Sequence, residues 1–226
     1  MQVRLTSSVK ILLIGASGGI GTALAHAFEG AALTTLSRSE DGLDVTDEDS
    51  VRRAAERLPG PFDLVFDATG GLEIAGRGPE KALADIDSQA MAAQFALNAI
   101  GPALLLKHFA PKLAREGRSV FATLSARVGS IGDNRIGGWY SYRAAKAALN
   151  QIMRTAAIEL GRTNKAAIVV ALHPGTVATG LSARYLGRHK SVSPDEAAAN
   201  LVRVLHGLRP EHSGGFYDYA FREIPW

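Results

Sequence analysis

Tyr142 and Lys146 are the two residues of this sequence whose types and spacing best suit acid–base chemistry. Four residues apart in a helix, their side chains would share one face. That face continues through Leu149, Met153 and Leu160, an apolar stripe that would pack on a sheet. Burying a lysine at the head of such a stripe is costly unless the lysine has a task. The alternative is a core tyrosine beside a lysine whose amine reaches solvent.

The chemistry that these residue types suit is carbonyl reduction, which needs a hydride at carbon and a proton at oxygen. A tyrosine hydroxyl can donate the proton, but its ordinary pKa of about 10 hinders exchange near neutrality. A lysine ammonium beside it, together with the positive charge of an oxidised nicotinamide, would lower that pKa. Ser125, at the end of a predicted strand, can donate a hydrogen bond to the same substrate oxygen.

Short apolar runs alternate with longer segments of helical periodicity along the chain. The runs are apolar at consecutive positions, which is typical of strands covered on both faces. The predicted strands are Val9–Ile14, Leu33–Leu36, Phe62–Phe66, Ser119–Leu124 and Ala167–Leu172, and the predicted helices are Ile20–Glu29, Glu48–Leu58, Ser88–Arg115 and Trp139–Arg162. This alternation predicts a single-domain Rossmann fold over residues 1–226: an α/β, doubly wound parallel sheet with helices on both faces.

Glycine-rich and polar residues follow the predicted strands, and in doubly wound sheets ligands bind outside the carboxyl ends of the strands. After the first strand come Gly15, Gly19 and Gly21, which open the first predicted helix. Glycines there allow a tight turn and let backbone N–H groups approach a pyrophosphate at the helix N-terminus. A plain strand-to-helix turn is the alternative, but the position directly after the first strand favours a dinucleotide site.

The end of the second predicted strand distinguishes NADP from NAD. An acidic residue there would hold the 2′-hydroxyl of the ribose, whereas an arginine accommodates a 2′-phosphate. The chain has Ser37 and Arg38 at this point, which favours NADP(H) over NAD(H). Glu40 and Asp41 could reach back to a ribose, so NAD remains an alternative, and a solvated surface arginine is the structural alternative.

Several motifs occur together in one order along the chain: Ile14-Gly-Ala-Ser-Gly-Gly-Ile-Gly21, Asp44-Val45, Leu97-Asn98-Ala-Ile-Gly101, Ser125, Tyr142-x-x-x-Lys146 and Pro174-Gly175-Thr-Val177-x-Thr179. In this order they resemble the short-chain dehydrogenase/reductase family over essentially the whole chain. Residues 124–146 and the ending Ile224-Pro225-Trp226 resemble the C-factor-like and sniffer-like carbonyl reductase branch.

The resemblance implies an NADP(H)-dependent oxidoreductase that interconverts a ketone or aldehyde and an alcohol by direct hydride transfer. Tyr142 would be the acid/base, and Lys146 would lower its pKa and bind the nicotinamide ribose. Ser125 would steady the substrate oxygen, and Asn98 would hold a water of the proton relay. The family also implies a small-molecule substrate and a homodimer or homotetramer.

The same resemblance implies a set of cofactor contacts. Asp44 and Val45 would meet the adenine ring, and Val177 and Thr179 the carboxamide. The full set is Gly15, Ser17, Gly18, Gly19, Ile20, Arg38, Asp44, Val45, Ala68, Thr69, Gly70, Tyr142, Lys146, Pro174, Gly175, Val177 and Thr179.

Three positions depart from the family pattern. Ala68 stands where the family often has asparagine, which puts some local rigidity in doubt. Ile14 stands where a threonine is common. The interval from Ser125 to Tyr142 is 17 residues, longer than usual, and the extra residues are expected to form part of the pocket wall.

Composition excludes several other classes. The chain has no Cys, so disulfides, a thiolate nucleophile and cysteine-ligated metals are excluded, and its 6 His lack metal-ligand spacing. A net charge of +3 is too small to indicate nucleic acid. The apolar runs fall far short of the roughly 20 residues of a membrane span. We expect a soluble, cytoplasmic protein without a metal.

Other features have two interpretations each. His173 is either a second proton donor or a structural residue, and Trp139 and Tyr140 either shape the substrate pocket or pack. Residues at about 180–193 are expected to form a short lid over the cofactor. The aromatic tail from Phe216 is expected to add a last strand or a subunit contact.

Two rival functions remain open at this point. One is a cofactor-binding regulatory or signalling protein of the same fold with little turnover. The other is an S-adenosylmethionine methyltransferase, which Arg38 at the ribose position disfavours.

Overall fold

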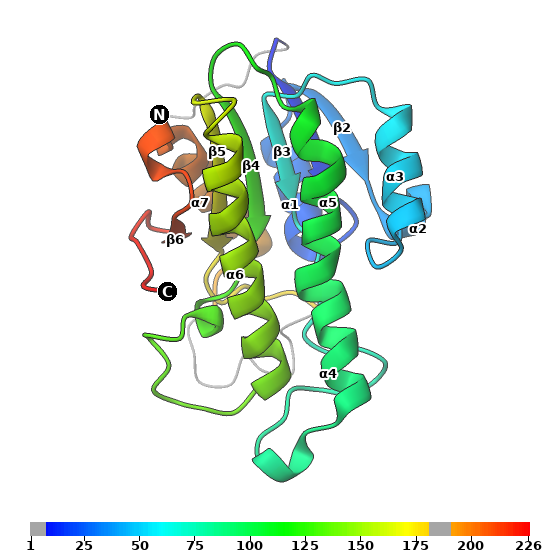
Figure 1. Ribbon diagram of the computed structural model, residues 1–226, viewed down its shortest axis with the longest axis vertical. Helices are drawn as coiled ribbons and strands as arrows, with labels where there is room; N and C mark the ends of the chain where they lie inside the picture. The colour runs from blue at the N-terminus through cyan, green and yellow to red at the C-terminus, as the bar shows by residue number, and fades with distance from the viewer. Residues whose placement is uncertain (1–7, 181–190) are drawn as a thin grey trace.

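The computed structural model describes residues 8–180 and 191–226, and every strand in these residues belongs to one parallel sheet (Figure 1). The sheet has the order β2-β1-β3-β4-β5-β6. Its strands are β1 (Lys10–Ile14), β2 (Ala32–Leu36), β3 (Leu64–Asp67), β4 (Ser119–Leu124), β5 (Ala167–His173) and β6 (Phe216–Asp218). Strands β2 and β3 flank β1 on opposite sides, so the winding direction changes there. This confirms the predicted doubly wound α/β fold.

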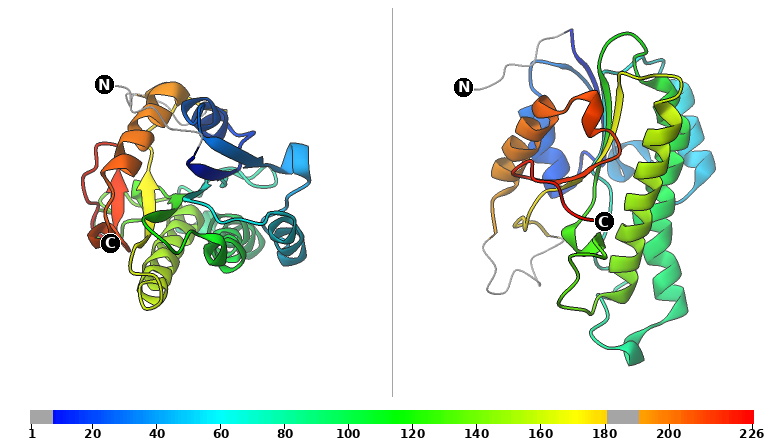
Figure 2. Two further views of the ribbon diagram at one scale, coloured as in Figure 1. Left: turned by 90° about the horizontal axis from the view of Figure 1, so that it is seen from above. Right: turned by 60° about the vertical axis from the view of Figure 1, so that its left-hand side comes forward.

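Helices cover both faces of the sheet because its strands are apolar on both sides. In β1, Leu12 and Ile14 belong to one buried cluster, whereas Ile11 and Leu13 belong to the other. The first cluster lies under α3 (Glu48–Arg57), α5 (Gly101–Phe109) and α6 (Tyr140–Leu160), and the second under α1 (Gly19–Ala27) and α7 (Pro194–Gly207). Figure 2 shows these two layers from above.

The predicted helix Ser88–Arg115 is not one continuous α-helix. It consists of α4 (Ser88–Phe95), a π-helical turn η2 (Ala96–Ile100) and α5, followed by the 3₁₀ turn η3 (Ala110–Lys112). The π turn precedes Pro102, which has no N–H for the carbonyl of Asn98. Pro111 explains why the α-helix ends before the predicted Arg115.

The C-terminal part contains the strand β6 and a helix, α7, that was not among the predicted helices. The tail forms β6, one of the two arrangements that its sequence suggested. Before it lies α7, which begins where the Ser193 hydroxyl accepts the N–H of Glu196 at 3.1 Å and Pro194 occupies the first turn. Most of the predicted lid, residues 181–190, lies outside the described residues.

Among the described residues, the helical segment Ser88–Lys112 has the length and apolar composition of a membrane-spanning helix. Its α5 part buries Leu105, Leu106 and Phe109 in the core between the sheet and α6. This packing accounts for the apolar composition of the segment.

Four shorter elements connect the main ones. They are α2 (Arg38–Asp41) and the 3₁₀ turns η1 (Leu83–Asp85), η4 (Arg127–Gly129) and η6 (Pro210–His212). Both α2 and η4 follow the carboxyl ends of strands, which are the lower ends of the arrows in Figure 1. The N-terminal end of α6 and the π turn η2 lie toward the same lower side.

Candidate active site

The turn between β1 and α1 has a conformation and close contacts that require glycine. Gly15 has a φ of 85°, and a Cβ there would lie 2.9 Å from the carbonyl carbon of Ala68. The predicted contacts Ser17, Gly18 and Gly19 are exposed, and the N-cap residue of α1 is Gly18, which has no side chain to cap the helix. Backbone N–H groups of its first turn therefore face outward, as the pyrophosphate of a dinucleotide requires.

The segment Pro174–Thr179 closes back onto this glycine turn. The Cγ2 atom of Thr179 lies 2.8 Å from the point where a Cβ of Gly19 would stand, so a side chain at Gly19 would collide with it. Val177 is buried and pairs with Val192. Two predicted cofactor segments that are far apart in sequence are therefore in contact at one edge of the sheet.

At the end of β2, Arg38 is exposed, whereas the carboxylate of Asp41 is bound to the backbone of the turn. The backbone N–H of Ser37 donates to the Asp41 carboxylate at 2.7 Å, so Asp41 holds the turn. Arg38 begins α2 and is exposed. Two hydrogen bonds from Thr46 lower the pKa of Asp44, and the charge of Arg38 acts in the same direction. The exposed Arg38 guanidinium therefore stands at this edge of the sheet beside the ionised carboxylate of Asp44.

Val45 is placed differently from its neighbour Asp44. Asp44 is exposed at the edge of the sheet, whereas Val45 is buried in the apolar cluster with Val51 and Leu105. Little of the Val45 side chain is left for the predicted adenine contact. Buried and exposed residues alternate in this segment, so when Asp44 faces the edge of the sheet, Val45 faces the core.

A buried carboxylate that the sequence analysis did not single out organises the end of β3. Asp67 accepts hydrogen bonds from the backbone and hydroxyl of Thr69, at 2.9 and 2.6 Å, and from the Thr123 hydroxyl at 2.7 Å. Burial raises the pKa of Asp67, against the effect of these donors. The network supplies the local rigidity that Ala68 cannot supply.

Asn98, in the π turn, binds the backbone of Gly71 in the loop after β3 through two hydrogen bonds. Its amide nitrogen donates to the Gly71 carbonyl at 2.8 Å and to the Gln94 side chain at 2.7 Å, and its oxygen accepts from the Gly71 N–H at 3.1 Å. Both amide hydrogens are thus used within the protein, and these bonds position the loop after β3. The predicted water at Asn98 stays a prediction.

Tyr142 and Lys146 share one face of α6, as their spacing predicts. The Nζ atom of Lys146 lies 5.9 Å from the centroid of the Tyr142 ring and donates to the Leu124 carbonyl at 2.9 Å. The same Nζ lies 3.4 Å from the point where a Cβ of Gly70 would stand. Lys146 is buried, which excludes a lysine whose amine reaches solvent.

Burial dominates the ionisation of this pair. It raises the pKa of Tyr142 to about 12. It lowers the pKa of Lys146 to about 8, although the negative charge of Asp67 acts in the opposite direction. Desolvation of the phenolate sets the direction of this shift. The predicted lowering of the Tyr142 pKa by Lys146 together with an oxidised nicotinamide stays a prediction.

Ser125 does not have the predicted arrangement. Its hydroxyl is buried and donates to the Asn150 side-chain oxygen at 2.6 Å, two helical turns beyond Tyr142 on α6. A hydroxyl has only one proton to donate. The hydroxyl proton that was expected to bind the substrate oxygen is donated to Asn150 and links β4 to α6.

We predict that Ser125→Ala lowers stability more than turnover. It should remove about 1–3 kcal/mol from the free energy of unfolding, because the Asn150 oxygen loses a buried donor. Denaturant unfolding and kcat measure the two effects. Ser119→Ala is a matched control, since that buried hydroxyl at the other end of β4 donates to Ala114 at 2.8 Å. A large fall in kcat with unchanged stability would instead show that Ser125 donates a hydrogen bond to the substrate oxygen.

Glu80 is a second buried carboxylate that sequence reasoning missed. It accepts hydrogen bonds from the backbone N–H of Ser141 at 3.1 Å and from the Ser141 hydroxyl, and its own carbonyl accepts from Trp139 at 2.6 Å. Trp139 has a φ of 54° and packs edge-on against Tyr142, with ring centroids 6.2 Å apart. These contacts fix the first turn of α6 and hence Tyr142.

His173 ends β5 beside the predicted nicotinamide segment. Burial, and secondarily the charge of Arg127, lower its pKa to about 4. His173 is therefore neutral near pH 7. The structure thus brings together the glycine turn, the loop from Ala68 to Gly70, Asn98, Tyr142, Lys146 and the segment from Pro174, whereas Ser125 and Val45 are directed elsewhere.

Comparisons with known proteins agree with this arrangement. A family model described as enoyl-(acyl carrier protein) reductase matches residues 15–212. A 1-hydroxy-2-glutathionyl-2-methyl-3-butene dehydrogenase from Rhodococcus sp. (strain AD45) is 33% identical over 96% of this chain and 99% of its own. The C-signal protein of Myxococcus xanthus is 35% identical over 74% of this chain and 94% of its own.

Among solved structures, the NADPH-bound carbonyl reductase from chicken fatty liver superposes with a TM-score of 0.80 at 26% identity. The match covers 99% of this chain and 100% of the reductase. The family model, the Rhodococcus relative and the carbonyl reductase structure are all named for oxidoreductases. The chain belongs to the short-chain dehydrogenase/reductase family.

Proposed function

We propose that this protein is an NADP(H)-dependent carbonyl reductase that interconverts a ketone or aldehyde and an alcohol. The observation that carries the proposal is the pair Tyr142 and Lys146, held on one face of α6 next to the Gly70 turn. A protein that only binds a dinucleotide has no need of a buried lysine beside a half-buried tyrosine.

In this mechanism a bound nicotinamide supplies the hydride, and the protein supplies the proton and the orientation. Tyr142 donates its phenolic proton to the substrate oxygen, and it is protonated at all ordinary pH values because burial raises its pKa to about 12. The Lys146 ammonium stabilises negative charge that develops on the phenolic oxygen. Glu80 holds the first turn of α6, which carries Tyr142. Asp67 and Asn98 hold the loop after β3, whose Gly70 lies beside the Lys146 amine.

A direct test measures oxidation of NADPH with a panel of aldehydes and ketones. We expect reduction of at least some of these compounds, with a higher kcat/KM for NADPH than for NADH. The Rhodococcus relative is named for a dehydrogenase reaction on an alcohol, which supports this reaction class for the present chain. Inertness of every carbonyl compound with both cofactors would contradict the proposal.

We expect Arg38→Glu to reverse the cofactor preference. Loss of a charge-assisted bond to the 2′-phosphate, with repulsion in its place, should raise KM for NADPH by about 10- to 100-fold. KM for NADH should change much less. Arg57→Glu on α3 is a matched control, because it makes the same charge change at an exposed residue at the end of that helix. Equal effects on both cofactors would refute the role of Arg38.

A second candidate function is a signalling protein that binds the cofactor without turnover. The match to a relative named C-signal is the observation that favours it. Tight NADPH binding in calorimetry together with an inert carbonyl panel would support this function over the first.

A further inference from the structure

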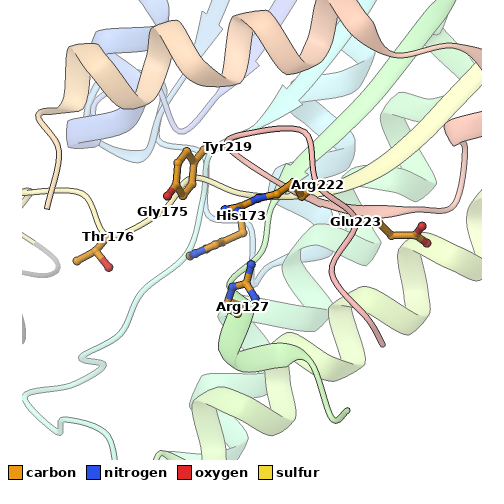
Figure 3. Close-up of a pocket in the computed structure, with 7 residues that line it drawn as sticks. All are labelled: Arg127, His173, Gly175, Thr176, Tyr219, Arg222 and Glu223. Atoms are coloured by element: carbon orange, nitrogen blue, oxygen red, sulfur yellow. The ribbon is translucent and has the colours of Figure 1, made fainter. Parts of the chain in front are cut away.

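A pocket of about 540 Å³ opens at the carboxyl ends of β4, β5 and β6, beside the proposed nicotinamide site. Figure 3 shows the side chains that line it. They are Arg127, His173, Gly175, Thr176, Tyr219, Arg222 and Glu223. Gly175 and Thr176 belong to the segment expected to contact the nicotinamide, so the pocket adjoins the proposed cofactor site. The volume suits a small organic ligand.

Two arginines of this pocket are held by one fully buried carboxylate. Asp218 accepts from the Nη2 atom of Arg127 at 3.4 Å, and from the Nε and Nη2 atoms of Arg222 at 3.0 and 2.9 Å. Asp218 is 1% exposed, whereas the arginine side chains keep 44% and 68% of their surface exposed. One buried acid thus fixes two guanidinium groups whose remaining N–H donors face the pocket or solvent.

The other acidic groups near the arginines compete weakly with a ligand. Asp133 accepts from the Nη1 atom of Arg127 at 2.8 Å, and a guanidinium group has five N–H donors, so further donors of Arg127 remain for a ligand. Figure 3 shows the carboxylate of Glu223 directed away from Arg127 and His173. A ligand anion can therefore bind these guanidinium groups without facing Glu223.

His173 provides an independent sign of a polar ligand. In the described part of the chain, its Nδ1 atom is the one buried side-chain nitrogen or oxygen without a hydrogen-bond partner. Buried polar atoms in folded proteins nearly always have a partner. Because His173 is neutral, one ring nitrogen can donate a hydrogen bond and the other can accept one.

We infer that this pocket binds a carboxylate group of the substrate, so that the preferred substrates are aldehydes or ketones that carry a carboxylate. Arg127 and Arg222 bind the carboxylate oxygens, and His173 completes the polar lining. This inference rests on the proposed reductase function and adds the substrate class. Arg127 and Arg222 are then specificity-determining residues.

The test compares two aldehydes of the same shape, 4-carboxybenzaldehyde and its methyl ester, as substrates with NADPH. We expect kcat/KM to be at least about 10-fold higher for the acid in the wild type. Arg127→Gln and Arg222→Gln should each bring the ratio of acid to ester close to 1, and Arg127→Lys should keep part of the preference. Arg135→Gln, an exposed arginine of the neighbouring loop outside the pocket lining, is the matched control and should keep the ratio.

The outcomes separate this inference from the proposed function. Equal reduction of acid and ester, or a preference that survives both arginine substitutions, overturns the carboxylate site while the reductase function stands. If neither aldehyde nor any other carbonyl compound is reduced, the proposed function fails. The site is then judged by calorimetry: binding of the acid that weakens at least about 10-fold in Arg127→Gln supports it, and binding unchanged by this substitution overturns it.

Discussion

Tyr142→Phe is expected to lower kcat for carbonyl reduction by about 10³-fold and to leave the affinity for NADPH within a few-fold of the wild type. The substitution removes only the phenolic hydroxyl, and the ring that packs against Trp139 remains. Stopped-flow or steady-state kinetics measure kcat, and fluorescence titration measures the Kd for NADPH. The size of the effect follows from loss of the one proton donor that the mechanism assigns to the substrate oxygen.

Tyr140→Phe is the matched control for this experiment. It removes the same hydroxyl two residues earlier, in the first turn of α6, from a side chain that the mechanism does not use. We expect its kcat to stay within about 3-fold of the wild type, as is usual for substitutions away from the chemistry. Turnover that survives in Tyr142→Phe would contradict the mechanism, and so would an equal loss in both variants.

Lys146→Met is expected to lower kcat/KM by about 10²-fold and to change the pH dependence. Burial lowers the pKa of Lys146 to about 8, so its ammonium is present below this pH and is lost above it. Carbonyl reduction in the wild type should therefore decline as the pH rises through about 8. The variant should lack this decline, because it has no ammonium to lose. Lys112→Met is a matched control, since that lysine donates to the Leu58 carbonyl away from the site.

The same pKa predicts how the stability of the protein depends on pH. The folded pKa of Lys146, about 8, lies below the ordinary 10.5, so between these values the unfolded chain binds more protons. The wild type should therefore gain stability relative to Lys146→Met as the pH rises from 8 to 10.5. Urea unfolding at several pH values measures this difference. A constant difference would show that folding does not lower the pKa of Lys146.

The strands of the sheet could be predicted because each apolar run consists of consecutive residues and can be recognised without knowing its neighbours in space. Ser119–Leu124 forms β4 with the predicted bounds, and all six of its residues are buried. The spacing of Tyr142 and Lys146 likewise sufficed to place both on one face. These features depend on residues close together in sequence, where periodicity and helix geometry act directly.

The groups that hold the site could not be predicted in the same way. Glu80 lies 61 residues from Ser141, and Asp67 lies 56 residues from Thr123. No local pattern relates them, and only the crossovers between strands bring them together. Ser125 illustrates a related limit: its position at the end of β4 was clear, but the contact with Asn150 depends on how α6 packs.

The direction of the Tyr142 pKa shift depended on burial, which residue types alone do not give. The loss of solvent around the phenol raises this pKa, and no pattern of residue types in the sequence shows how far a side chain is desolvated. The carboxylate pocket likewise depends on three strand ends meeting, with Arg127 and Arg222 far apart in sequence around Asp218.

The most direct test of the reductase function follows a deuterium label from NADPH deuterated at the transferring C4 position to the product. Mass spectrometry of the alcohol should show one deuterium on the former carbonyl carbon for the wild-type protein, and almost no alcohol for Tyr142→Phe in the same time. Label that appears only in solvent, or labelled alcohol formed equally fast by both proteins, would contradict hydride transfer coupled to the tyrosine proton.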